Sequence, residues 1–528
     1  MVVSLIEAQK LNEYYQRTEL FATTIIHIVG LGCLSAFIIT MLFNINRFHI
    51  FPLITWQFGI FFASQQIFPI FSNYVPKWRC SPDEEFAKNC SAYLHCRSEV
   101  EFDQIYFHSA AMEFDWICGW SSYWATFFSQ LQFAGVLIGT FTCGSLSDNF
   151  GRKPVALGAM TMGITASLLS AVSPTWQFLL VTRFFVGLAV GGTLVVVCTF
   201  VMESILAEQR MALRAFINWG VARLLMTVIC YFFNDWRSAS IACALFASPA
   251  ILVIAFVLPE SPTWLHYQGK LEEMRESEKR QAKIAGVEYV EVSHAPIVAK
   301  QGFKNIVRDI KLFKRISVLW LMWFVASFCG YAIDLNSSNI SGDLFLNQVI
   351  FSILIAGSKI VIVTFDTLSE HFSRRFLHQF SQFVAIVCFL ILTLLVFADY
   401  DGTWILVVNV IGTVFIEMSW DACYLCGVEV MPTAMRASTM GSCSLIARIG
   451  AIMAPVLAYM NAHWPPSAYL TVVLLGSLNL FVSYRGLVET KGINLDHVHI
   501  EEEEDAQRDP QEVVKMLSTN ETKEPSKA

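Results

Sequence analysis

The stretch GSLSDNFGRK at residues 144–153 has a second copy, DTLSEHFSRR, at residues 366–375. Both copies carry an acid, a Phe and two bases at the same spacing, and Glu370 follows Asp148 by 222 residues. A further acid–base pair, seven residues apart, repeats at nearly this distance: Glu203 with Arg210, and Glu429 with Arg436. Two independent matches at nearly the same offset indicate an internal duplication. Parallel repeats of this kind predict a transporter whose site lies where the repeats meet.

The composition agrees with a chain that lives in a membrane. Of 528 residues, 55% are apolar and only 15% are charged, against about 25% charged in an ordinary soluble domain. The mean hydropathy is +0.52. These values exclude soluble enzymes, nucleic-acid binders and secreted disulfide scaffolds. No Walker loop is present, so direct ATP coupling is not expected.

A bilayer core needs about 20 apolar residues per helix, and the sequence offers thirteen such runs. Six lie between residues 48 and 258, and six lie between 316 and 488. We therefore predict an all-α polytopic membrane protein of 6+6 helices in two pseudo-symmetric halves. The halves are residues 45–262 and 316–488. The thirteenth run, Leu20–Phe43, is a candidate extra helix in an N-terminal extension, residues 1–44.

Three polar stretches predict the orientation. Residues 263–315, the central loop, carry eleven Lys/Arg and seven Asp/Glu, whereas residues 73–121 carry four Lys/Arg and eight Asp/Glu. Basic loops face the cytoplasm, so the central loop is predicted inside and 73–121 outside. The acidic segment 489–528 is predicted to be a disordered cytoplasmic tail.

The predicted outer loop, 73–121, also carries the marks of an oxidising compartment. It holds a glycosylation sequon at Asn89 and four cysteines. The cysteines are candidates for disulfides, and their pairing is left open among three arrangements: Cys80, Cys90, Cys96 and Cys118. Clustered cysteines with a sequon are typical of an extracellular face.

The repeated charges fall at the predicted cytoplasmic helix ends. There an acid can pair with a base or with a helix N-terminus, and such contacts can hold one side of a carrier shut. The alternative is a set of positive-inside anchors, found in any membrane protein. The candidate gating residues are Asp148, Arg152, Lys153, Glu203, Arg210, Glu260, Glu370, Arg374, Arg375, Glu429 and Arg436.

Several stretches resemble a known family. GSLSDNFGRK resembles the signature loop of the major facilitator superfamily, and PESPTWL at 259–265 resembles its P-E-S-P-R-W-L motif, with Thr263 in place of the usual Arg. EFDWIC at 113–118 and EVMPTAMR at 429–436 resemble motifs of the organic cation, anion and zwitterion transporter family. The resemblance covers about residues 45–490 and implies alternating access without covalent chemistry. No catalytic residue, cofactor or metal is expected.

Four ionisable residues inside predicted spans are candidates for substrate contact, because such residues usually face a cavity. They are Lys359, Arg448, Glu417 and Asp421. The resemblance favours an anion carrier, since a Lys at the position of Lys359 is similar to that of the anion members, and an Arg at the position of Arg448 is similar to that of the anion and carnitine-type members. The two acids leave a zwitterion (carnitine-like) or a cation open.

Aromatic residues near these charges are candidates for gripping the organic body of a substrate, and core packing is the alternative. They are Trp420, Tyr424, Phe328 and Tyr331. We therefore expect a plasma-membrane carrier of small organic ions, most simply anions, with a counter-transported dicarboxylate or a proton as a partner. More distant alternatives are a sugar facilitator and a non-transporting receptor of the same fold.

Overall fold

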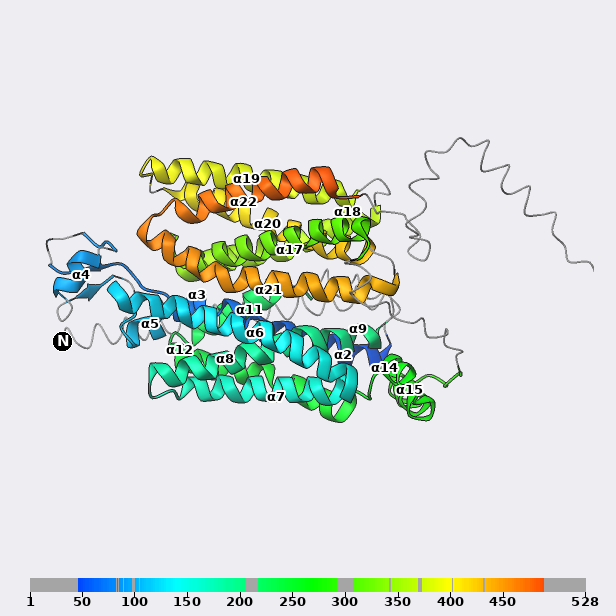
Figure 1. The fold of residues 1–528 in the computed structure, drawn as a ribbon. Helices are drawn as coiled ribbons and strands as arrows, with labels where there is room; N and C mark the ends of the chain where they lie inside the picture. Colours follow the sequence, from blue (N-terminus) through cyan, green and yellow to red (C-terminus); the bar gives the residue numbers. More distant parts are fainter. Residues whose placement is uncertain are drawn as a thin grey trace, which may run out of the picture. The chain divides into compact units, whose positions relative to one another are not determined.

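The computed structural model is mostly helical (Figure 1). It describes residues 46–488 except 82, 84, 89, 97–99, 104, 206–216, 292–307, 341–342, 369–372, 401 and 431–432. The candidate helix Leu20–Phe43 and the predicted acidic tail lie outside the described residues.

Within the described residues, nine helical segments are long and apolar enough to cross a membrane. They are Arg152–Ala171, Trp176–Ser204, Trp236–Val257, Ile310–Asn336, Leu344–Phe365, Arg374–Phe397, Thr403–Gly427, Ser438–Asn461 and Ser467–Gly486. Three other predicted spans form α2 (Arg47–Ala63), α6 (Ser122–Phe150) and the shorter α11 (Trp219–Phe232). The prediction of an all-α polytopic chain is confirmed.

The chain divides into two compact units that do not coincide with the two sequence halves. Unit 1 comprises residues 1–115, 134–293 and 348–364, and unit 2 comprises residues 116–133, 294–347 and 365–528. The start of α6 thus belongs to unit 2, and the centre of α18 (Leu344–Leu368) belongs to unit 1.

Unit 1 contains the helices of the first half, apart from the start of α6, together with the centre of α18. Two short helices follow α2: η1 (Ser64–Ile67) and α3 (Pro69–Ser72). The helices that follow α6 are, in order, α7 (Arg152–Ala171), α8 (Trp176–Gly192), α9 (Cys198–Ser204), α11, α12 (Trp236–Ala247) and α13 (Pro249–Leu252). Two π-helical segments interrupt this series: η3 (Thr193–Val197) between α8 and α9, and η4 (Val253–Val257) after α13. Helices α6 and α8 meet where Gly139 and Gly191 leave room for the facing backbone. Small residues allow this close approach in helices that cross membranes.

Unit 2 is built from long helices that run alongside one another (Figure 1). They are α17 (Ile310–Asn336), α19 (Arg374–Phe397), α20 (Thr403–Glu429), α21 (Thr433–His463) and α22 (Ser467–Gly486), with the short η2 (Gly119–Ser121) and η5 (Ser337–Asn339). Two apolar clusters form its core, one around Trp323 and Cys423 and the other around Phe328 and Phe389. The two cysteines of the CxxC sequence, Cys423 and Cys426, are free thiols buried in the first cluster.

The polar stretches also contain regular structure. In the predicted outer loop, β1 (Trp78–Arg79) pairs antiparallel with β2 (Glu101–Phe102), and α4 (Cys90–Cys96) and α5 (Ala110–Glu113) follow the two strands. In the central loop, α14 (Pro262–Tyr267) and the charged α15 (Leu271–Ala285) form before the gap that begins at residue 292.

Candidate functional site

An ion-pair network gathers several of the predicted gating residues in unit 1. Asp148 lies near the end of α6 and Arg152 begins α7. The Arg152 guanidinium lies 2.7 Å from the Asp148 carboxylate and 3.5 Å from that of Glu203, which is on α9. Arg152 thus joins the ends of three helices. Because 60% of the Asp148 side chain is exposed, water screens the ion pair between Asp148 and Arg152, and the pair adds little stability.

Glu260 lies at the N-terminus of α7, although it is more than a hundred residues away in sequence. Its Oε1 accepts hydrogen bonds from the backbone N–H groups of Arg152 and Lys153, both at 3.0 Å, and from that of Ser261 at 2.9 Å. A carboxylate at this position satisfies donors that the helix leaves unpaired and complements the helix dipole. Glu260 therefore caps α7.

Gly151 makes this remote cap possible. Its φ of 111° and ψ of 158° lie in a region that is essentially restricted to glycine. A Cβ atom at this position would lie 2.5 Å from Oε2 of Glu260. A side chain at residue 151 would therefore displace the carboxylate that caps the helix.

Three further side chains complete the network, and the sequence reasoning missed them. Ser261 donates to Glu203 at 2.6 Å, and the Trp264 indole and the Gln268 amide both donate to the Asp148 carbonyl at 2.9 Å. Lys153, a predicted member, donates through Nζ to the Leu258 carbonyl at 2.7 Å. Ser261, Trp264 and Gln268 could have been found from the sequence, because they lie inside or just after the PESPTWL stretch.

The second copy of the motif is described only in part. Ser373 caps α19 through its own hydroxyl, which accepts from the Phe376 N–H at 3.1 Å. Arg374 is buried, and Arg375 donates to the Tyr484 carbonyl at 2.6 Å. The remaining predicted members cannot be placed, because Arg210 and Glu370 lie outside the described residues, as do the side chains of Glu429 and Arg436.

A second cluster of polar contacts lies in unit 1, at the base of the predicted outer loop. Glu113, at the end of α5, accepts from the Trp236 indole at 2.7 Å and pairs with Arg237, which also donates to the carbonyls of Ala171 and Ser173. Burial raises the pKa of Glu113, but the hydrogen bonds from Arg237 and Trp236 outweigh it, and its pKa is lowered overall. The stability from this pair is therefore lost only as pH falls through that lowered pKa.

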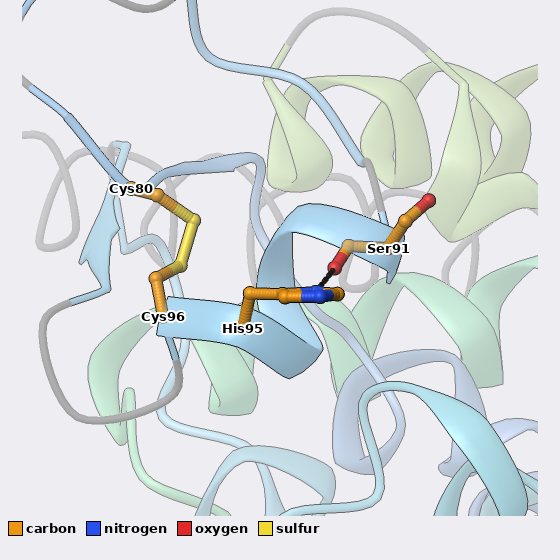
Figure 2. The surroundings of a disulfide bond; sticks show 4 residues. All are labelled: Cys80, Ser91, His95 and Cys96. Carbon is orange, nitrogen blue, oxygen red and sulfur yellow. Dashed lines mark hydrogen bonds between the residues drawn. A yellow bond between two sulfur atoms is a disulfide. The ribbon is translucent and has the colours of Figure 1, made fainter.

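The four cysteines of the predicted outer loop are all oxidised. Cys80 pairs with Cys96 at the end of α4, with their Cα atoms 5.7 Å apart (Figure 2). One turn earlier, the Ser91 carbonyl lies 2.8 Å from Nδ1 of His95. Cys90 and Cys118 are disulfide-bonded as well. The sequon residue Asn89 lies outside the described residues.

Two of the candidate aromatic residues, Trp420 and Tyr424, form a cluster with Trp323, a residue that the sequence reasoning missed. Trp420 and Tyr424 stack with their ring centroids 5.7 Å apart, and both meet Trp323 of α17 edge-on, at 5.5 and 4.5 Å. The Trp323 indole donates to the Cys423 carbonyl at 3.2 Å. Trp323 is buried, whereas Trp420 and Tyr424 are only half-buried. The two outer rings can therefore present a face to a ligand.

Tyr331 lies among the candidate charges of unit 2. Its hydroxyl is within electrostatic range of Arg448 on α21, Glu417 on α20 and Asp334 on α17. Its ring lies 4.8 Å from that of Phe133, and the other candidate of α17, Phe328, stacks on Phe324 in the core. Asp421 and Glu417 are both half-buried on α20. Asp334, which is 95% buried, was not among the predicted site residues.

Unit 1 contains the candidate Lys359 and two bases that the sequence reasoning overlooked. Lys359, on α18, is 8% exposed, and Arg183 and Arg223 are almost completely buried. Arg183 donates to Gln65 at 3.1 Å and to Ser240 at 2.9 Å. Arg223 donates to Gln348 of α18 at 2.6 Å and lies over the ring of Phe351. Both arginines could have been identified from the sequence, because each is a charged residue inside an apolar helix, α8 for Arg183 and α11 for Arg223.

The chain is similar to membrane transporters in sequence and in structure. The family model described as sugar (and other) transporter matches residues 83–501. An uncharacterised Caenorhabditis elegans protein is 37% identical over 86% of this chain and 94% of its own length. Solute carrier family 22 member 7 of Mus musculus is 29% identical over 76% of this chain and 75% of its own, and an organic cation transporter protein of Drosophila melanogaster is 27% identical over 77% and 75%.

The fold is also found among solved structures. The inward-open xylose transporter XylE from E. coli superposes with a TM-score of 0.59 at 15% identity, over 86% of this chain and 98% of its own. At this identity the likeness concerns the fold alone. Together with the apolar helices described above, these matches confirm the resemblance. The chain belongs to the sugar (and other) transporter family within the major facilitator superfamily, and it is a multi-pass, non-enzymatic secondary transporter of small organic solutes.

Proposed function

We propose that this protein carries small organic anions across the plasma membrane by alternating access, with its C-terminus in the cytoplasm. The observation that carries the proposal is the placing of two bases on apolar helices: the buried Lys359 on α18 and Arg448 on α21, beside Tyr331. A base is costly to hold within the bilayer, so it usually serves a ligand or an ion pathway. A fixed positive charge in a medium of low dielectric constant favours a carboxylate or a sulfate.

The geometry of arginine adds to this preference. A guanidinium can hold a carboxylate through two parallel hydrogen bonds, whereas an ammonium acts as a point charge. Arg448 is half-buried, so its charge is only partly solvated. Tyr331 lies close enough to interact with it and offers a hydroxyl as a second donor.

The aromatic cluster supports an organic substrate rather than an inorganic ion. Trp420 and Tyr424 are stacked and half-buried, and they flank Asp421 in sequence. Flat aromatic faces grip an apolar body, while a few polar groups fix its orientation. A sugar facilitator is disfavoured, because a neutral substrate would gain little from the buried charges.

The acids support the second candidate, an organic cation or zwitterion. Glu417 and Asp334 also lie within electrostatic range of Tyr331, and an aromatic face attracts a cation. If both signs of charge contact the substrate, a carnitine-like zwitterion fits the site. Uptake of a proton by Glu417 or Asp421 would couple transport to a proton gradient. Exchange for an intracellular dicarboxylate and facilitated diffusion without coupling are the alternatives.

The test is uptake of para-aminohippurate, carnitine and tetraethylammonium, side by side, in oocytes at two pH values. The proposal predicts that para-aminohippurate enters fastest and that the other two ions compete with it weakly. Faster uptake of tetraethylammonium would overturn the anion assignment, and faster uptake of carnitine would favour the zwitterion. Glycosidase treatment tests the orientation, since it should shift the mobility of the wild type and not that of Asn89→Gln.

A further inference from the structure

A shallow apolar groove runs between α19 and α22 of unit 2. It encloses about 780 Å³. Phe376, Phe380 and Phe383 line one side, and Leu480, Phe481 and Tyr484 line the other. Most of these rings are strongly exposed; Phe383 is 55% exposed and Phe481 is 59% exposed. On a helix that crosses a membrane, such a surface is covered by lipid chains.

Two arginines lie at one end of this groove. Arg375 begins α19, and its guanidinium donates to the Tyr484 carbonyl at 2.6 Å and lies 5.5 Å from the centre of the Tyr484 ring. Arg485, near the end of α22, lies 5.4 Å from the centre of the Phe481 ring. Both guanidinium groups are therefore held against rings that line the groove.

A buried amide lies one turn along α19 from Arg375. The Nε2 atom of Gln379 is inaccessible to water and has no hydrogen-bond partner among the described residues, and Gln379 also lines the groove. Residues four apart share a helix face, so this donor lies below the arginines. A buried amide without an acceptor is costly, and turning the Gln379 side chain outward onto an ester carbonyl in the groove would supply one.

The order of these groups along the groove matches one kind of molecule. Cationic groups lie at one end against Tyr484 and Phe481, an amide lies one turn along α19, and Phe380 and Phe383 continue the apolar lining beyond it. We propose that this groove binds an anionic phospholipid, with its net-negative headgroup at Arg375 and Arg485, a glycerol ester at Gln379 and an acyl chain along the phenylalanines. Basic pockets between membrane helices on the cytoplasmic side are suited to acidic headgroups. This site is separate from the proposed substrate contacts and does not depend on the sign of the substrate.

The experiment is native mass spectrometry of the full-length protein in detergent, titrated with phosphatidylserine or phosphatidylcholine. The wild type should retain phosphatidylserine more strongly. Each arginine near the membrane surface is worth about a five-fold change in affinity, so Arg375→Gln with Arg485→Gln should weaken phosphatidylserine by roughly 25-fold and leave phosphatidylcholine nearly unchanged. The matched control is Arg308→Gln, an exposed arginine before α17 that should leave both lipids unaffected.

A second pair of variants tests the apolar part of the groove with its charges intact. Ser477 lines the groove, whereas Leu474, one turn earlier on α22, is 62% exposed and does not. Ser477→Trp should weaken both lipids several-fold, and Leu474→Trp should weaken neither. The proposal is overturned if the preference for phosphatidylserine survives the double arginine substitution, or if soluble glycerophosphoserine competes as well as the lipid. Equal effects of the two tryptophan variants would also overturn it.

Discussion

The two copies of the repeated motif start their helices with different caps. In the first copy, the N-terminus of α7 is capped by Glu260, which lies more than a hundred residues away, and Gly151 leaves the space for it. In the second copy, Ser373 occupies the position of Gly151 and caps α19 with its own hydroxyl. The position before the helix is thus a glycine (Gly151) where a distant carboxylate caps the helix, and a serine (Ser373) where the cap is local. The first cap ties α7 to the segment before α14, whereas the second is made within the first turn of α19.

The largest loss of stability is expected from Gly151→Ser, which puts into the first copy of the motif the serine that the second copy has at Ser373. Serine at a φ of 111° is strained, and its Cβ would displace Glu260. Together these effects should cost about 2–4 kcal/mol of stability. The measurement is the thermal unfolding midpoint of the purified protein.

The matched control for that variant is Gly158→Ser, in the same helix, where a Cβ atom meets nothing within 4 Å. It should change the midpoint little. Equal shifts for Gly151→Ser and Gly158→Ser would show that the remote cap has no special role, and the contrast between the two copies would then fail.

Glu260→Gln should have the next largest effect. The amide keeps one acceptor for the N–H groups of Arg152 and Lys153 but loses the charge that complements the helix dipole. We expect a loss of about 1–2 kcal/mol in unfolding experiments. Glu273→Gln removes an exposed pair with Lys270 and an exposed charge in the first turn of α15, and should cost less than about 1 kcal/mol. A similar loss in both variants would contradict the capping role.

Ser373→Ala removes the local cap of α19 and should cost about 1 kcal/mol, whereas Ser373→Gly should cost only a few tenths. The reason is that a glycine leaves the helix end accessible to water. Thermal unfolding of the two variants in parallel checks this order. If Ser373→Gly were as damaging as Gly151→Ser, the two copies would not differ in the way described.

The smallest effect on stability is expected from Asp148→Asn. The carboxylate is largely exposed and pairs with Arg152, so its loss should cost at most about 1 kcal/mol. If the network gates transport, uptake should slow several-fold while ligand binding stays unchanged. A change in surface expression alone would favour the role of a positive-inside anchor.

The sequence predicted which groups would be charged at the helix ends, but not which groups they would meet. Glu260 was expected among the gating residues, yet its target, the start of α7, follows from a long-range contact that no local pattern carries. Similarly, β1 and β2 have two residues each, too few to show an alternating pattern. The long apolar helices were predictable because membrane thickness sets their length.

Buried polar groups were the hardest part to predict. Arg183 and Arg223 lie singly within apolar runs, and one base does not change the hydropathy of a span enough to attract notice. Trp323 is one of fourteen tryptophans, and only the structure places it between Trp420 and Tyr424. The sequence supplied candidates such as Arg448 and Tyr331, and the structure places them within electrostatic range of each other.

The most direct test of the proposed substrate charge is the ratio of para-aminohippurate to tetraethylammonium uptake in Lys359→Ala and Arg448→Ala, normalised to surface expression. Removing one partner of a desolvated charge pair costs about 2–5 kcal/mol, so para-aminohippurate uptake should fall at least about 30-fold. Lys359→Arg and Arg448→Lys keep the charge and should retain part of the activity. Unchanged para-aminohippurate uptake in both alanine variants would contradict the anion assignment.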